Sequence, residues 1–159
     1  MAITGIETLL FGVEDLEKST RFFDDFGLVR KGTDEAHSHF RLDEGSNVIL
    51  RHIDDPLVPK SVYQGFGVKR VVWGVDSQQG LDELAERLAQ KQAIRRDDDG
   101  TVHFATGSGL PTALRVFARK KVTYAPDPVN APGHVNRLNT PRKWKTRARP
   151  KTITHTVFA

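Results

Sequence analysis

Ile6-Glu7-Thr8-Leu9-Leu10-Phe11-Gly12-Val13-Glu14-Asp15 sets a pattern that the chain repeats. The second copy is Val68-Lys69-Arg70-Val71-Val72-Trp73-Gly74-Val75-Asp76, and the third is Ile153-Thr154-His155-Thr156-Val157-Phe158. Each copy begins with an apolar residue, has a polar residue two places on, and continues as an alternating apolar run that ends in an aromatic residue. This alternation predicts a β-strand. In the first two copies Gly-Val leads through an acidic residue into an amphipathic helix, so the repeat is a strand–helix unit.

The first unit is predicted over residues 1–57. Its opening strand covers 5–13, and Asp15 is placed to cap the following helix, because a short carboxylate accepts from the free backbone N–H groups there. Gly27 is placed to end that helix. The helix face expected to pack on the core consists of Leu16, Thr20, Phe22, Phe23 and Phe26. Extended runs at 28–31, 37–42 and 47–53 complete a β-α-β-β-β unit.

The second unit is predicted over residues 68–121, after a connector at 58–67 that contains proline and glycine. Its helix carries Leu81, Leu84, Ala85 and Leu88 at helical spacing. Three further strands are expected at 93–96, 101–106 and 112–117. The chain from 1 to 121 therefore reads as two βαβββ units.

The charge of the chain is unevenly distributed. Residues 1–121 contain 17 Lys and Arg against 19 Asp and Glu, whereas 122–159 contain 7 basic residues and one acidic residue. The excess of basic residues belongs to a Pro-rich linker predicted over 122–150. A solvated linker is the simpler interpretation of its basic run, and phosphate binding with Trp144 as a stacking platform is the other. No nucleic-acid fold surrounds that run, so we expect no nucleic-acid partner.

Composition also limits the location and the chemistry. No apolar run approaches the roughly 20 residues that span a bilayer, and no basic segment followed by an apolar stretch opens the chain. The sequence has no cysteine, which excludes disulfides and thiolate metal sites. We therefore expect a cytoplasmic protein with no membrane partner.

The paired units carry a resemblance to a known family. Units that open on an Ile-x-x-apolar strand, followed by Val-Glu-Asp-Leu-Glu-Lys-Ser-Thr-Arg-Phe-Phe-Asp-Asp-Phe-Gly-Leu at 13–28, resemble the vicinal oxygen chelate superfamily. That superfamily contains glyoxalase I, bleomycin-resistance proteins and extradiol dioxygenases. The resemblance covers about residues 3–121. It implies an α+β fold in which paired βαβββ units form a cupped, eight-stranded mixed sheet with helices outside and a divalent metal in the cup.

The resemblance also implies where metal ligands would lie. The family takes them from the third residue of each opening strand, His or Gln, and from a Glu in each unit's last strand. The matching positions here hold Thr8, Arg51, Arg70 and Arg115. A guanidinium keeps its proton and has no lone pair to offer, whereas a catalytic ion needs imidazoles and carboxylates. We therefore expect no metal cofactor in this chain alone, and a glyoxalase-type isomerisation lacks its four ligands.

Strand parity places these four residues on the concave side of the sheet. The residues expected to face the helices instead are Leu9, Phe11, Val71, Trp73, Leu114 and Val116. The arginines then have two interpretations. They clamp an anionic ligand through bidentate hydrogen bonds, or they are structural and pair with cup-lining carboxylates such as Glu7, Asp43 or Glu44.

The histidines of the two units are weaker candidates for a metal site. His37 and His39 share one face of a strand and His52 lies on another, but the sequence fixes no carboxylate beside them. We interpret each as an ordinary strand residue. His103 lies in the middle of a strand that borders the cup. The complete set of ligand-pocket candidates is Thr8, Arg51, Arg70, His103 and Arg115.

His155 differs from the other histidines. In the third copy it takes the position of Thr8 and Arg70, and there it is the residue type that the family's ligand position requires. A single strand with nothing behind it builds no core. We therefore expect residues 151–159 to open a third unit of a longer protein, in which His155 binds the metal.

This layout resembles the N-terminal half of two-domain extradiol dioxygenases. The resemblance implies that a first pair of units without metal supports a second pair that holds Fe(II) or Mn(II) through two His and one Glu. The implied function is ring cleavage of catechol-type compounds in aromatic catabolism. Its catalytic residues would lie outside this chain, so we expect the chain alone to be inactive.

A second function stays open. A metal-free binding protein of the bleomycin-resistance kind would hold a small aromatic or anionic ligand in the cup formed by the two units, as a homo-oligomer. Two further βαβββ units beyond Ala159, carrying a His and a Glu, would favour the dioxygenase.

Overall fold

The computed structural model describes residues 3–123, 132–133 and 149–156. The first unit contains β1 (Ile3–Val13), α1 (Leu16–Asp25), β2 (Val29–Thr33), β3 (His37–Arg41) and β4 (Asn47–His52). The second contains β5 (Gly67–Val75), α2 (Gln78–Ala89), β6 (Arg95–Arg96), β7 (Val102–Ala105) and β8 (Pro111–Val116). The expected α+β fold of two βαβββ units in one eight-stranded mixed sheet is confirmed.

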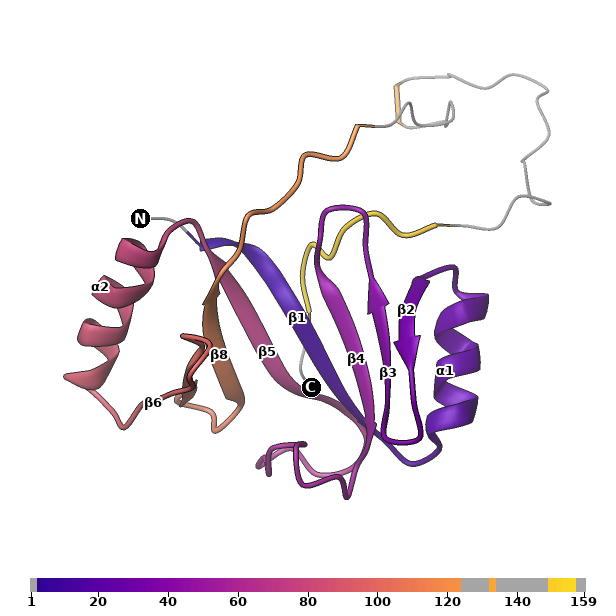
Figure 1. The fold of residues 1–159 in the computed structure, drawn as a ribbon, viewed down its shortest axis with the longest axis horizontal. Coiled ribbons are helices and arrows are strands. Elements are labelled where there is room, and N and C mark those ends of the chain that lie inside the picture. The colour runs from indigo at the N-terminus through magenta and orange to yellow at the C-terminus, as the bar shows by residue number, and fades with distance from the viewer. Residues whose placement is uncertain (1–2, 124–131, 134–148, 157–159) are drawn as a thin grey trace.

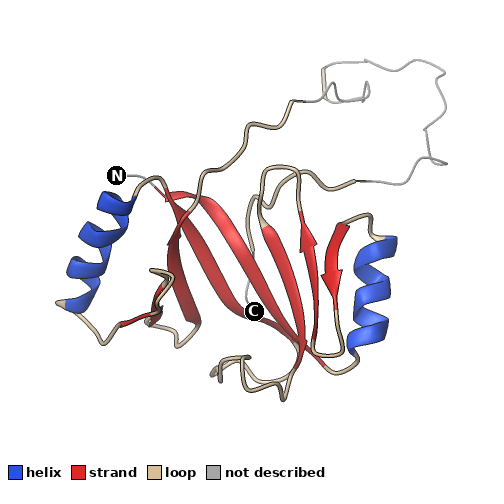
Figure 2. Cartoon of the chain, in the orientation of Figure 1, coloured by secondary structure: helices blue, strands red, loops and turns tan. Residues whose placement is uncertain are grey.

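Antiparallel pairing of β1 with β5 joins the two units at the centre of the sheet, whose order is β2-β3-β4-β1-β5-β8-β7-β6 (Figure 1). In each unit the last strand returns parallel to the first, so β4 pairs with β1 and β8 pairs with β5. The two helices lie at opposite ends of the sheet (Figure 2), with α1 on β3 and β4 and α2 on β5 and β8.

The repeated glycine of the opening strands has a packing reason. A Cβ at Gly12 would lie 2.5 Å from Ile53 Cδ1, and a Cβ at Gly74 would lie 2.5 Å from Phe117 Cδ1. Ile53 and Phe117 are equivalent, because each is the residue directly after the last strand of its own unit. The glycine of each opening strand therefore leaves room for the side chain that follows the last strand of the same unit. This explains why both copies of the sequence pattern contain a glycine at this position.

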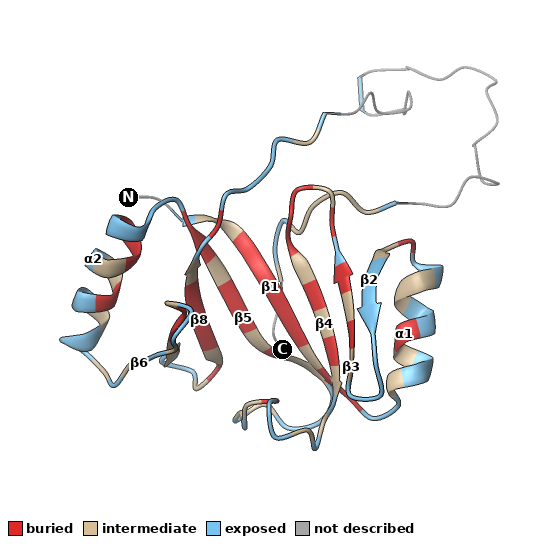
Figure 3. Ribbon diagram, viewed as in Figure 1, coloured by how far each residue is buried: buried red, intermediate tan, exposed pale blue. Residues whose placement is uncertain are grey.

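The core on the helix side of the sheet consists of three clusters of buried residues. Figure 3 marks the buried stretches of the strands and helices in red. One cluster, under α2, consists of Val75, Leu81, Ala85, Val102 and Leu114. A central one consists of Ile6, Leu9, Val71 and Leu110, and one toward α1 consists of Phe40, Leu42, Val48 and Leu50. Trp73 packs against the first two clusters and Phe11 against the last two. Val116, expected on the same side, is 41% exposed, because the cluster under α2 ends at Leu114.

Helix α1 begins and ends as the sequence predicts, but its apolar face is narrower. Asp15 accepts from the Lys18 N–H at 2.8 Å, and Gly27 follows the helix with a φ of 96°. Phe22 and Phe26 are 61% and 55% exposed, so their assignment to the core was wrong. The sheet is covered by Leu16, Thr20 and Phe23, which follow one helical stripe, whereas Phe22 and Phe26 stack on each other beside it with ring centroids 6.1 Å apart.

Residues 149–156 differ from the strand expected at the third copy of the pattern. They contain no strand, and Ile153 packs against the central cluster and the cluster toward α1. Its backbone N–H donates to Glu44 Oε1 at 2.6 Å. The segment lies against the middle of the sheet, where β1 already has a neighbour on both sides, so no strand edge is free to pair with it. The linker expected over 122–150 lies mostly outside the described residues.

Glu44 connects three parts of the chain. It is 1% exposed in the turn between β3 and β4, and it receives hydrogen bonds from Ser46 Oγ, the Arg119 guanidinium and the Ile153 N–H. Arg119 comes from the segment after β8, so one buried carboxylate ties the first unit to the end of the second and to residues 149–156. Lys151 strengthens the same junction through an ion pair with Asp43 at 2.7 Å.

Substituting Gly74 with alanine tests the packing reason for the repeat. The added Cβ would meet Phe117 in a closed site, and we expect Gly74→Ala to lower the free energy of unfolding by about 1–3 kcal/mol, the usual cost of overpacking. Gly107→Ala is the control, because nothing lies within 4 Å of its Cβ and its φ is not positive. Urea denaturation of the two variants measures the difference, and equal stability would contradict the explanation.

Candidate ligand-binding site

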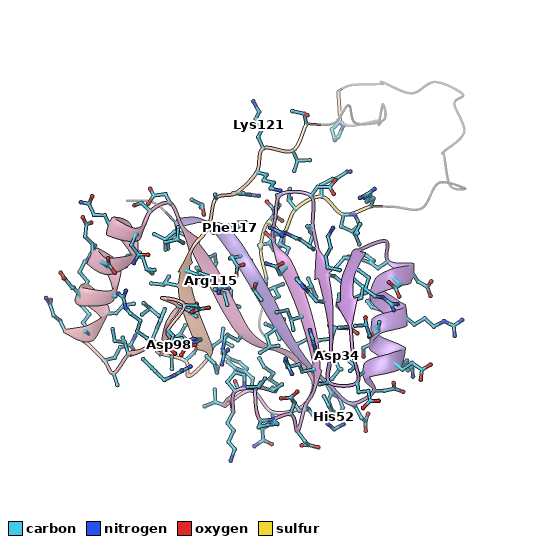
Figure 4. The ribbon with its side chains drawn as sticks, in the orientation of Figure 1. Asp34, His52, Asp98, Arg115, Phe117 and Lys121 are labelled. Carbon is cyan, nitrogen blue, oxygen red and sulfur yellow. The ribbon has the colours of Figure 1, made fainter. Side chains whose placement is uncertain are left out.

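The concave side of the sheet holds a hollow of about 540 Å³, within the range of small-molecule sites. Among the residues that line it are all five sequence-predicted candidates: Thr8, Arg51, Arg70, His103 and Arg115. They come from both units, and Figure 4 shows Arg115 on β8. The structure therefore brings the candidates to one place, and their binding of a ligand stays a prediction.

Strand register sets the floor of the cup. Across β4, β1 and β5, Ile49 lies opposite Leu10 and Leu10 lies opposite Arg70. A second row runs through Thr8, Val72, Ala113 and His103. Leu10, Val72 and Ala113 are buried. The floor is thus apolar, and Arg70 stands in it at the middle of the sheet.

Two of the cup arginines are held by carboxylates from nearby turns. Arg51 Nη1 donates to Asp55 Oδ2 at 2.7 Å, and the Arg115 guanidinium donates to Asp99. These ion pairs fit the structural interpretation for those two residues. The expected partners were wrong: Glu44 pairs with Arg119, Asp43 with Lys151 and Arg149, and Glu7 with neutral donors.

Arg70 is different. Within residues 3–123, 132–133 and 149–156 its guanidinium has neither a hydrogen bond nor an ion pair, although the residue is partly buried. Burial lowers the pKa of Arg70 from its ordinary value, the charge of Arg95 lowers it further, and Asp97 acts in the opposite direction. A guanidinium stays protonated under these conditions. The cup therefore contains a permanent, partly desolvated positive charge.

His103 stands beside this charge and is held by Asp97. Its Nε2 lies 2.7 Å from Asp97 Oδ2, and Asp97 also pairs with Arg95. Burial is the main cause that lowers the pKa of His103, the Asp97 hydrogen bond opposes it, and the charges of Arg70 and Arg95 lower it again. A lowered pKa leaves His103 neutral at pH 7, so it offers hydrogen bonding to a ligand rather than a second positive charge.

Glu7, which the sequence analysis expected to line the cup, belongs to a hydrogen-bonded chain that sequence reasoning missed. Thr8 Oγ1 donates to Glu7 Oε2 at 2.7 Å, Asn47 Nδ2 donates to Glu7 Oε1 at 2.9 Å, and His39 Nε2 lies 2.8 Å from Asn47 Oδ1. Parity alone would place Glu7 on the face opposite to Thr8. The register of β1 on β5 shifts between Ile6 and Thr8, and both Glu7 and Thr8 line the cup.

The donor set of the cup does not fit a divalent metal. No group of three His, Asp or Glu side chains able to hold an ion occurs within the described part of the chain. Thr8 Oγ1 is engaged with Glu7, and the other three positions that the sequence resemblance matched to metal ligands hold guanidinium groups that cannot ligate. His155 is exposed on the segment 149–156, outside the residues that line the cup, with Nδ1 2.9 Å from Thr154 Oγ1.

Solved structures similar to this chain include several dioxygenases. A catechol 2,3-dioxygenase matches with a TM-score of 0.58 and 21% identity over 72% of this chain and 39% of its own. The 2,3-dioxygenase LapB from Pseudomonas sp. KL28 matches with a TM-score of 0.60 and 20% identity, over 73% of this chain and 41% of its own. Homoprotocatechuate 2,3-dioxygenase from Arthrobacter globiformis matches with a TM-score of 0.57 and 20% identity, over 74% of this chain and 37% of its own.

These likenesses show the fold. The chain has the vicinal oxygen chelate architecture expected from its sequence, as found in extradiol dioxygenases, and its match spans about 40% of their length. No protein-family model and no curated protein matches the chain. Among the described residues, no helix is long and apolar enough to cross a bilayer.

The pKa of His103 should report the charge of Arg70. Because the Arg70 charge lowers that pKa, Arg70→Gln should raise it, whereas Asp97→Asn should lower it by removing the carboxylate that opposes the shift. Arg87→Gln removes an exposed positive charge from α2 and should leave it unchanged. Proton NMR of the His103 ring across a pH titration measures all three. An unchanged pKa in Arg70→Gln would contradict the placement of Arg70.

Proposed function

We propose that this chain is the metal-free half of a ring-cleavage dioxygenase-like protein. In this proposal the paired units at 1–121 form a supporting cup, and oxygen chemistry takes place at Fe(II) or Mn(II) in a second pair of units beyond residue 151. The substrate would be a catechol-type aromatic compound. A cytoplasmic location and a homo-oligomeric assembly belong to the same proposal.

One observation carries the proposal. A dioxygenase fold presents, at the four positions where its family binds metal, a threonine engaged with Glu7 and three arginines. Loss of every ligand in one cup fits a division of labour in which another cup keeps them. The share of the dioxygenase chains that this chain matches, 39% and 41% in two cases, is compatible with half of such a protein.

The second candidate is a metal-free binding protein of the bleomycin-resistance kind. The observation that favours it is the partly buried Arg70, which has no partner among the described residues, in a cup of about 540 Å³. A purely supporting cup gives no reason to keep a desolvated cation. The two candidates are compatible, since a supporting half can also bind a small molecule.

Metal analysis tests the dioxygenase proposal. The 159-residue chain, purified and dialysed, should contain well under one equivalent of iron or manganese. A longer product of the same reading frame should carry two further βαβββ units, keep a stoichiometric metal and cleave catechol. In that longer protein His155→Ala should abolish metal binding and ring cleavage while leaving the melting of the first two units unchanged.

His52→Ala, which removes an exposed histidine outside the proposed ligand position, is the control in the longer protein. Tight metal in the short chain would overturn the alignment of ligand positions. Retained metal and turnover in His155→Ala would remove the third unit from the proposal.

A further inference from the structure

The arginines that line the cup fall into two groups. Arg51, Arg95 and Arg115 each form an ion pair with an aspartate. Arg70 is the one without such a pair among the described residues, and it lies inside β5 rather than at its end. Three guanidinium groups at the wall of the cup are thus each neutralised by an aspartate. The guanidinium of Arg70, in the floor, has no such carboxylate among the described residues.

An uncompensated cation in a partly desolvated place is unfavourable, because burial removes water without supplying a partner. Asp97 lies near enough to act on the charge of Arg70, but its two oxygens are engaged by Arg95 and His103. Glu7 is likewise engaged by Thr8 and Asn47. An anion that enters the cup would therefore meet Arg70 without displacing an existing ion pair.

The surroundings of Arg70 restrict the kind of anion. Leu10 lies directly opposite Arg70 and Ile49 lies beyond it, and Val72 follows two residues along the same strand, on the same face. A small inorganic anion would leave this apolar floor uncovered in a hollow of about 540 Å³. A molecule with an apolar body and one carboxylate satisfies both features, because a planar carboxylate matches the guanidinium fork with two parallel hydrogen bonds.

We propose that the cup binds a small organic carboxylate whose carboxylate group is held by Arg70 and whose apolar body lies over Leu10 and Ile49. His103 borders the same space as a neutral hydrogen-bonding group. The site rests on the second candidate function, the metal-free binding protein, and names the chemical class of its ligand; it needs neither a metal nor a second pair of units. The inference rests on this chain's own residues.

Benzoate is the probe. Isothermal titration of the purified 159-residue chain with benzoate should give saturable binding with one site per chain. Benzamide has the same ring without the charge, and acetate has the charge without the ring, so each should bind at least about tenfold more weakly. Inorganic phosphate should bind no more tightly than acetate. Benzamide equal to benzoate, or no saturable benzoate binding, would overturn the proposal.

Variants locate the site. Arg70→Gln should weaken benzoate about tenfold to a hundredfold, the range for a lost charge-assisted hydrogen bond. Arg70→Lys keeps the charge without the fork and should fall between the wild type and Arg70→Gln. Arg87→Gln, on the exposed side of α2, removes one positive charge elsewhere and should bind as the wild type does. Equal weakening by Arg87→Gln would indicate a general charge effect and contradict the site.

Thermal melting accompanies each titration, so a loss of binding counts only in a variant that melts as a folded protein. If Arg70→Gln does not fold, Arg70→Lys and the ligand series on the wild type still decide the outcome. Failure of benzoate binding leaves the dioxygenase proposal standing, because that proposal is tested by metal content and ring cleavage of the longer protein. A longer protein without metal or ring cleavage likewise leaves the carboxylate site standing, whereas a metal ion held tightly in the cup of the short chain would overturn both proposals.

Discussion

The pairing of β1 with β5 is the constraint on which the rest of the structure depends. It joins two units that have their own helices and core clusters, and it makes one continuous concave surface from two halves. The register that aligns Leu10 with Arg70 also puts a guanidinium in the middle of an apolar floor. A shift by one residue would turn Arg70 toward the helices, where no charged group is accommodated without a partner.

The sequence around each arginine explains why the cup arginines differ. Asp55 follows Arg51 by four residues in the turn after β4, and Asp99 lies in the turn between β6 and β7, beside the end of β8. Arg70 lies within β5 next to the apolar residues Leu10 and Val72, and the nearby Asp97 is held by Arg95 and His103. Ion pairs formed with turn carboxylates therefore reach the wall of the cup but not its centre. The same arginines make the cup unsuitable for a metal and suitable for an anion.

Most of the fold could be predicted from the periodic patterns in the sequence. The Phe-Gly-Val and Trp-Gly-Val endings of β1 and β5 locate both opening strands. Strand parity alone predicts that Thr8, Arg51, Arg70 and Arg115 share one face, and in the structure all four line the cup. What parity cannot show is an irregularity. Glu7 was expected to line the cup, and it does, but the register shift that lets Glu7 and its neighbour Thr8 share one face has no signature in the local sequence.

The carboxylate partners of the cup arginines and the place of Ile153 were also beyond sequence reasoning. Asp55 and Asp99 reach their arginines through turn conformations, and Ile153 packs on the sheet without forming a strand because every central strand already has two neighbours.

A crystal structure of the chain with 4-bromobenzoate tests the central claim most directly, since the anomalous signal of bromine marks the ring. The account predicts a bromine peak over Leu10 and Ile49, with the carboxylate on Arg70. A carboxylate bound to another arginine, or a metal ion in the cup, would contradict it.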